Sequence, residues 1–263
     1  MCGIVGVVST DQCNQQIYDS LLLLQHRGQD STGIATMDGK VFHINKSKGQ
    51  VREAYRTRDM RALIGKLGLG HVRYATKGAA HREEEAQPFY VNAPYGIILV
   101  HNGNLTNTRE LERELFKVDK RHTNTSSDTE MLLNVLATEL NTAIKGNEIN
   151  PDDLFNAVKT LHARVEGSYA SIALIAGHGL LAFRDPFGIR PLVIGKREVE
   201  KNKSEWVIAS ESLVIESNDY EIVREVEPGE AIFITSDGEF FSEQCSNNPQ
   251  LFPCSFEYVY LAR

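Results

Sequence analysis

The sequence predicts an α+β domain in which sheets and helices form layers. Short apolar runs bounded by Gly, Pro, Asn and Asp recur along the chain, as expected for strands. Several of these runs are apolar without alternation, which is typical of strands covered on both faces. The helical segments fall between them in groups rather than alternating singly with strands, which favours an α+β arrangement over repeated βαβ units.

Nine segments have the composition of strands. The predicted strands cover residues 3–8, 33–37, 69–72, 88–91, 97–101, 170–176, 180–183, 206–209 and 231–235.

Four helices are predicted between these strands. The first, over residues 17–24, is short and apolar. The next two begin at Asn107 and Ser127, each of which is followed three residues later by a glutamate, the spacing of a capping box. The fourth begins at Asn150, because Pro151 and the two aspartates after it favour a first helical turn.

The chain is predicted to divide into a domain over residues 1–237 and a connector over residues 238–263, where the pattern of strands and helices weakens. A length of 263 residues suits one large domain or two small ones. It is also long enough to bury a core without disulfides or metals.

Composition excludes several classes of protein. Lys and Arg number 28 against 35 Asp and Glu, a net charge of −7, which argues against a nucleic-acid partner. No run approaches the roughly 18–20 apolar residues that span a bilayer, and the first eight residues lack the basic start of a secretory signal. The four cysteines form no C-x-x-C pair. We therefore expect a cytoplasmic protein with reduced thiols and no membrane partner.

Known motifs for metals, phosphates and serine hydrolysis are missing from the sequence. The glycine-rich stretch 65–70 lacks the Lys-Ser/Thr ending of a phosphate loop. No zinc-type spacing of His and Cys occurs, and there is no Gly-x-Ser-x-Gly elbow. No metal site is predicted.

The N-terminus carries the most unusual feature of the chain. Cys2 follows only the initiator Met1, and cysteine is small enough for the methionine to be removed, which leaves a free α-amine on Cys2. An α-amine has a pKa of about 7.7–8.0 and a thiol one of about 8.5. One residue can therefore supply both a base and a nucleophile. The alternative is that Cys2 begins a buried strand as a small apolar residue.

Three other positions also admit two interpretations. Asn102 and Gly103 follow the apolar run 97–100 and are typical of a hairpin turn, but their side-chain amide and backbone N–H can also converge on one oxygen as an oxyanion hole. Arg73 ends another apolar run, where it can be a solvated surface residue or can bind a carboxylate through two hydrogen bonds. Asp128 fits a first helical turn, and it can also receive an ammonium group.

Together these positions fall within a recognisable set of segments. The segments are MCGIVG at 1–6, QHRGQDS at 25–31, GHVRYAT at 70–76, HNGNLTN at 101–107 and SSDTE at 126–130. They resemble the type-2 glutamine amidotransferases, which are N-terminal-nucleophile hydrolases. Within that superfamily, RDPFGIRPL at 184–192 and CSFEYVYLAR at 254–263 are similar to the amidophosphoribosyltransferases. The resemblance extends over essentially the whole chain.

The resemblance implies a fold and a set of roles. The fold is a four-layer αββα sandwich of the N-terminal-nucleophile hydrolase type. Cys2 is expected to attack the side-chain amide of glutamine, while Asn102 and Gly103 hold the oxyanion. Arg73 is expected to bind the α-carboxylate of glutamine and Asp128 its α-ammonium group.

Three further residues enter the expected substrate-binding set. By the same resemblance, Arg27 and Gly28 shape the surroundings of the nucleophile. Thr76 lies in the segment 74–79, which is expected to close over the substrate and shield the thioester from water.

The resemblance also implies partners that act beyond these residues. The chain is expected to release ammonia from glutamine, which the full-length enzyme passes to phosphoribosyl pyrophosphate to make 5-phosphoribosylamine in the first step of purine synthesis. The phosphoribosyltransferase domain that does so, with Mg²⁺, lies outside this chain, and the segment 238–263 leads toward it. No cofactor is expected in the chain itself, no iron–sulfur cluster is assigned, and the full-length enzyme is expected to be a homo-oligomer.

Two alternatives to this expected function remain at this point. One is another type-2 glutamine amidotransferase with a different acceptor for the ammonia. The other is a non-catalytic regulatory module that keeps the fold.

Overall fold

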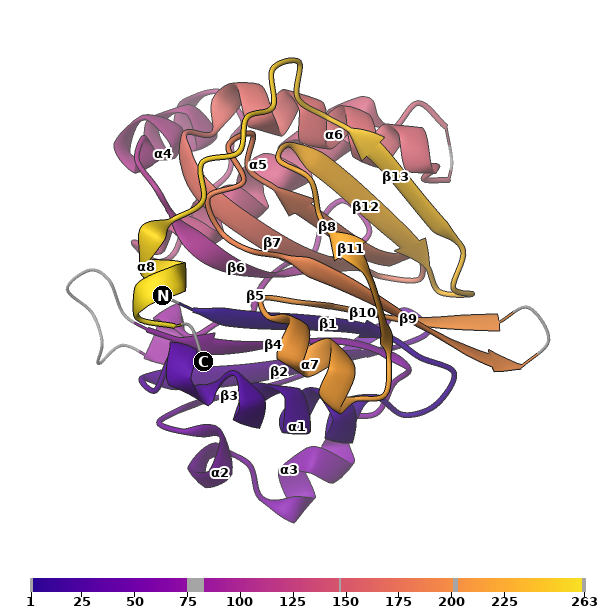
Figure 1. The fold of residues 1–263 in the computed structure, drawn as a ribbon. Coiled ribbons are helices and arrows are strands. Elements are labelled where there is room, and N and C mark those ends of the chain that lie inside the picture. The colour runs from indigo at the N-terminus through magenta and orange to yellow at the C-terminus, as the bar shows by residue number, and fades with distance from the viewer. Residues whose placement is uncertain (1, 75–82, 147, 201–202, 262–263) are drawn as a thin grey trace.

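Two antiparallel β-sheets stack face to face and carry helices on their outer faces (Figure 1). The structure is a computed structural model that describes residues 2–74, 83–146, 148–200 and 203–261. The predicted α+β class is confirmed, and the layers form an αββα sandwich.

The first sheet has seven strands within the described residues, and β1 lies at its centre. In spatial order they are β11 (Glu221–Glu225), β9 (Val193–Glu200), β10 (Lys203–Ala209), β1 (Gly3–Val8), β4 (Leu67–Arg73), β2 (Ser31–Asp38) and β3 (Val41–Lys48). Because β1 pairs with β10 on one side and β4 on the other, the chain begins in the middle of a sheet.

The second sheet has six strands within the described residues. In spatial order they are β13 (Phe240–Gln244), β12 (Glu230–Thr235), β8 (Gly179–Arg184), β7 (Gly167–Ile175), β6 (Ile97–Leu105) and β5 (Phe89–Val91). The segment predicted as a connector thus contributes β13, which pairs with β12 along its whole length.

Helices cover the outer face of each sheet. Those on the side of the first sheet are α1 (Asn14–Leu23), α2 (Val51–Ala54), α3 (Thr57–Ala62) and α7 (Ser212–Ser217). Those on the second sheet are α4 (Thr108–Lys117), α5 (Asp128–Ala143) and α6 (Pro151–Arg164). Short 3-10 turns occupy Gln25–Arg27 and Glu83–Glu85, and α8 (Ser255–Val259) lies near the N-terminus of the chain (Figure 1). No helix among the described residues has the length and apolar character needed to cross a membrane.

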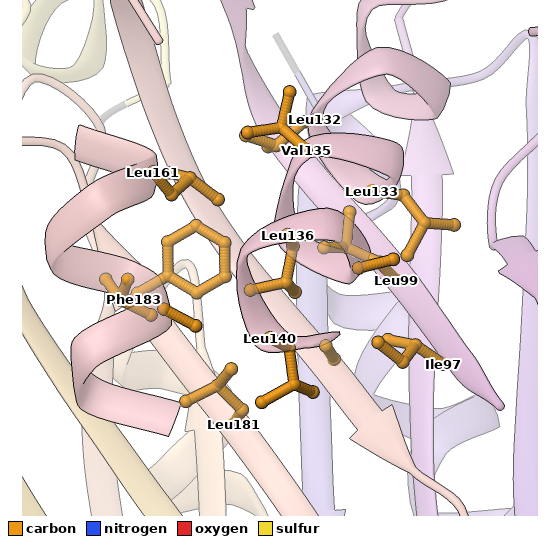
Figure 2. Close-up of a cluster of buried hydrophobic side chains, with 14 of the residues drawn as sticks. Ile97, Leu99, Leu132, Leu133, Val135, Leu136, Leu140, Leu161, Leu181 and Phe183 are labelled. Atoms are coloured by element: carbon orange, nitrogen blue, oxygen red, sulfur yellow. The ribbon is translucent and has the colours of Figure 1, made fainter. Parts of the chain in front are cut away.

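Three apolar layers hold the sandwich together. One fills the space between the sheets, one lies under α1 and α7, and one lies between the second sheet and α4 to α6. In the last of these, Leu132, Leu136 and Leu140 of α5 pack toward Leu99 of β6 and Phe183 of β8 (Figure 2). This burial of apolar area fixes the N-terminus of α5 close to the end of β6.

Both predicted capping boxes are wrong. α4 and α5 begin after Asn107 and Ser127 as predicted, but neither side chain caps its helix. The Asn107 amide instead bonds backbone groups at the end of α6 and just beyond it, and the Glu130 carboxylate accepts two backbone N–H groups from the loop before α5. The predicted helix start at Asn150 does have reciprocal bonds, between Asn150 and Asp153.

Candidate active site

Cys2 lies immediately before β1 and faces a residue of the other sheet. Its backbone nitrogen donates to Asn102 Oδ1 at 3.2 Å, and its sulfur lies 3.9 Å from the backbone oxygen of Tyr74. β1 is buried along its whole length, so the strand fixes the half-buried Cys2 at the point where the two sheets meet.

Asn102 and Gly103 belong to a strand and not to a hairpin turn. They are paired within β6 opposite Ala170 and Tyr169 of β7, which overturns the hairpin interpretation. The Asn102 side chain is buried, and its Oδ1 is taken by Cys2. Within the described part of the chain, its Nδ2 has no hydrogen-bond acceptor. A buried donor left without an acceptor is costly, and here it lies in the wall of a pocket, where a ligand oxygen can satisfy it.

Gly103 is required by the close packing of β6 and β7. A Cβ atom at this position would collide with the backbone oxygen of Ser168 and lie 2.6 Å from the His101 ring. Any side chain would therefore displace the strand beside the Asn102 amide.

Arg73 ends β4 and projects into the same pocket. Its Nη2 donates to Glu85 Oε2 at 2.7 Å, and Ser126 Oγ donates to the other carboxylate oxygen at 3.1 Å. Both charged side chains are mostly buried, with exposures of 12% and 5%. Glu85 thus holds the guanidinium in one orientation while the pocket keeps access to it.

Asp128 is the first residue of α5 and lines the same pocket as Arg73. Its Oδ2 accepts the backbone N–H of Leu105 at 3.1 Å, and its Oδ1 lies 4.0 Å from Nδ1 of His101. The side chain is a quarter exposed. The carboxylate is therefore fixed by the end of β6 but remains open to a ligand.

These side chains line a single pocket of about 130 Å³. Its wall includes Cys2, Arg73, Asn102, Gly103 and Asp128, together with Glu85, Gln87, His101, Ser126 and Arg190. Of its charged groups, Arg73 and Asp128, together with the thiol and the uncharged Asn102 donor, complement a ligand that carries a carboxylate, an ammonium group and a carbonyl oxygen.

Burial controls the protonation of the groups around the pocket. It raises the pKa of the Cys2 thiol, and the charge of Asp128 acts in the same direction. It lowers the pKa of His101, although the neighbouring Asp128 opposes the shift. His71 of β4 has its pKa lowered to about 3 by burial and by the charge of Arg73. The resting site therefore holds a thiol and neutral imidazoles near neutral pH.

Comparison with known proteins gives the family. A family model described as "Glutamine amidotransferase domain" matches residues 71–217, which is more than half of the chain. The chain belongs to the glutamine amidotransferase domain family.

Several relatives of this amidotransferase domain carry the same name. Proteins called amidophosphoribosyltransferase from Pasteurella multocida and Escherichia coli are 54% and 50% identical to it over 264 residues, which cover 100% of this chain and 52% of each relative. A solved glutamine phosphoribosylpyrophosphate amidotransferase from B. subtilis, complexed with ADP and GMP, matches with a TM-score of 0.82 and 31% identity over 100% of this chain and 53% of that one. The chain therefore spans about half the length of the relatives it matches.

Two residues expected to bind substrate, Arg27 and Gly28, do not line the pocket. Arg27 is buried behind Cys2, where its Nε donates to the backbone oxygen of Cys2 at 3.0 Å. Gly28 packs against the backbone of Arg73, and a Cβ there would collide with the Arg73 carbonyl. Thr76 lies outside the described residues, as does most of the segment 74–79 expected to close over the amidotransferase site.

Glu85 and Glu257 hold Arg73 and Arg27 in place and were not predicted from the sequence. Glu85 stands in a run of three glutamates, which in sequence is typical of a solvated surface. Glu257 stands in the segment read as a connector, with no nearby sequence feature that relates it to Arg27. No local feature of the sequence indicates that either glutamate holds an arginine of the site.

Proposed function

We propose that this amidotransferase domain hydrolyses glutamine to glutamate and ammonia, with Cys2 as the nucleophile. One observation carries the proposal: the Cys2 thiol, the Asn102 donor and the oppositely charged Arg73 and Asp128 line one pocket. Arg73 receives the α-carboxylate of glutamine and Asp128 its α-ammonium group, which directs the side-chain amide toward Cys2.

The first chemical step joins the Cys2 sulfur to the amide carbon. As the carbonyl becomes an oxyanion, the Nδ2 group of Asn102 donates to it, and the buried donor gains the acceptor that it lacks. The proton that leaves the thiol passes to the amide nitrogen, which departs as ammonia and leaves a thioester. Water then attacks the thioester, and the products are glutamate and the regenerated thiol.

A raised thiol pKa means that this reaction needs a base. Burial keeps the Cys2 thiol protonated near neutral pH. When Met1 is removed, the nitrogen that donates to Asn102 becomes an α-amine with an ordinary pKa of about 7.7–8.0. We assign to this amine the transfer of the thiol proton to the leaving nitrogen.

In the full-length enzyme, the ammonia is passed to phosphoribosyl pyrophosphate to give 5-phosphoribosylamine, the first step of purine synthesis. The names of the relatives, which the chain matches along its entire length, support this part of the proposal. We assign the Mg²⁺ expected with phosphoribosyl pyrophosphate to residues beyond this chain, and none of the steps above uses it.

Intact mass spectrometry tests the nucleophile directly. The purified chain is weighed before and after treatment with a glutamine-like diazoketone, and glutamate release is measured on the same sample. We expect a mass without Met1, a single adduct and glutamate release, all of which Cys254→Ala retains. Cys2→Ala loses the adduct and the activity. An adduct that persists in Cys2→Ala contradicts the proposal, as does a chain that keeps Met1 and still releases glutamate.

A further inference from the structure

The carboxylate of Glu257 joins the last described helix to two arginines at the active site. Its Oε2 accepts from Arg27 Nη2 at 2.7 Å, and its Oε1 accepts from Arg190 Nη1 at 3.2 Å. The Glu257 side chain is only 9% exposed, although α8 is otherwise a short surface helix. A carboxylate that bridges two guanidiniums in a mostly buried position makes strong, directional bonds.

The first of these arginines holds the backbone of the nucleophile. Arg27 is almost fully buried and uses all three of its nitrogen atoms: Nε donates to the Cys2 oxygen at 3.0 Å, Nη1 to Glu211 at 2.7 Å and Nη2 to Glu257. Because the guanidinium is planar and rigid, two carboxylates fix the direction in which Nε points. The position of the Cys2 carbonyl therefore depends on Glu257 through one intervening side chain.

The second arginine belongs to the wall of the pocket. Arg190 lines the pocket that also contains Cys2, Arg73 and Asp128. It follows a turn that is held by Asp185, whose carboxylate accepts the backbone N–H groups of Phe187 and Ile189. The backbone of Arg190 is thus anchored by this turn, while its guanidinium is anchored by Glu257.

The segment that carries Glu257 is itself fixed to that turn. Backbone N–H groups of Gln250, Phe252 and Cys254 donate to carbonyl groups of residues 186, 187 and 189 at 2.8–3.1 Å. The two arginines, the turn and α8 therefore form one connected unit beside the nucleophile. Residues 250–259 are thus linked to Cys2 by a continuous path of covalent bonds and hydrogen bonds.

We propose that Glu257 is a positioning residue for glutamine hydrolysis, which holds Arg27 on the Cys2 carbonyl and Arg190 at the pocket wall. The inference rests on the proposed function for its catalytic readout. Its structural part concerns the placement of Cys2 and is measured independently of turnover.

The test compares Glu257→Gln with the unchanged chain in two assays. The substitution keeps the shape of the side chain but removes its charge. We expect kcat for glutamate release to fall about tenfold or more, because hydrogen bonds to a charged group are lost and the reacting groups are misplaced. We expect iodoacetamide to alkylate Cys2 about threefold faster or more, because the residue is less restrained and the added net positive charge favours its thiolate.

Internal and matched controls separate positioning from unfolding. The buried Cys13 reports on the integrity of the fold, and its alkylation rate and the melting temperature are expected to stay at the values of the unchanged chain. Glu112→Gln removes the same charge from an exposed position of α4 and is expected to change neither assay. Glu257→Asp keeps the charge on a side chain that is one methylene shorter and therefore too short to bridge both arginines. We expect its kcat and its rate of Cys2 alkylation to lie between those of the unchanged chain and those of Glu257→Gln.

Either variant can overturn the inference. A folded Glu257→Gln chain with unchanged kcat and unchanged Cys2 alkylation does so. If Glu257→Gln does not fold, a folded Glu257→Asp chain with unchanged kcat and unchanged Cys2 alkylation also overturns the inference. If the unchanged chain releases no glutamate, the proposed function fails, and the alkylation of Cys2 alone decides whether Glu257 positions it.

Discussion

The backbone nitrogen of Cys2 donates to the side-chain oxygen of Asn102 at 3.2 Å, across the boundary between the two sheets. The residues are 100 positions apart, so the bond exists only because β1 and β6 face each other in the sandwich. It also orients the Asn102 amide, because an oxygen bound to Cys2 leaves the Nδ2 group as the remaining donor.

That orientation predicts a large catalytic effect for Asn102→Ala. Removing one donor to an oxyanion costs about 10²–10³ in rate, so we expect kcat for glutamate release to fall within that range. The fold should survive, because the substitution also removes a buried donor that has no acceptor in the described chain. Steady-state kinetics and a melting curve test this. Asn141→Ala on the exposed face of α5 serves as the control. A loss below tenfold refutes the role of Asn102.

Arg73→Gln is expected to act on binding more than on chemistry. The guanidinium is fixed by Glu85 at 2.7 Å and faces the pocket, where it meets the carboxylate of glutamine in the proposed complex. A hydrogen bond to a charged group contributes about 1.5–3 kcal/mol, so KM for glutamine should rise about tenfold or more while kcat changes less.

A substrate analogue provides the control for Arg73. Glutamine with its α-carboxylate replaced by a neutral amide lacks the group that Arg73 is proposed to bind. The unchanged chain and Arg73→Gln should therefore hydrolyse this analogue with similar kcat/KM. If Arg73→Gln lowers kcat/KM equally for glutamine and for the analogue, the residue does not recognise the carboxylate.

The sequence predicts the apolar strands of the sandwich better than the polar ones. Strands such as β1 and β6 are apolar runs covered on both faces, so the signal lies in the residues themselves. β3, β9, β11 and β13 were not predicted, because charged and polar residues interrupt them. Their place in a sheet depends on pairing with a neighbour, which a local pattern does not contain.

The site shows the same division between local and long-range information. The motifs around Cys2, Arg73 and Asn102 could be recognised because each is a short contiguous segment. The supporting contacts are of another kind: Glu257 reaches Arg27 across 230 positions of sequence. Only the folded chain brings α8 beside the 3-10 turn Gln25–Arg27, so no inspection of either segment alone could have paired the two residues.

The buried His71 makes stability depend on pH. Its folded pKa is about 3 because burial disfavours the charged ring, whereas the unfolded pKa is about 6.5. Between these values the unfolded chain binds more protons than the folded chain. The contribution of His71 to the free energy of unfolding is therefore greatest above about pH 6.5, and it decreases as the pH drops toward 3. His71→Gln should reduce the slope of the free energy of unfolding against pH by about 1.4 kcal/mol per pH unit in this window.

Urea unfolding at pH 4, 5, 6 and 7 measures that slope. His122→Gln changes an exposed histidine and is the matched control, which should leave the slope unchanged. Identical slopes in the unchanged chain and in His71→Gln would show that the ring is already protonated, or already solvated, in the folded state.

Gly28→Ala tests whether the close backbone contact behind Arg73 supports the site. A Cβ at Gly28 would collide with the Arg73 carbonyl, so the backbone at the end of β4 has to move. Overpacking of this kind costs about 1–3 kcal/mol of stability, and the displaced Arg73 should raise KM for glutamine. Gly146→Ala adds the same methyl where the nearest atom is 3.9 Å away and should alter neither quantity. A Gly28→Ala chain with unchanged stability and KM would mean that Arg73 does not depend on this contact.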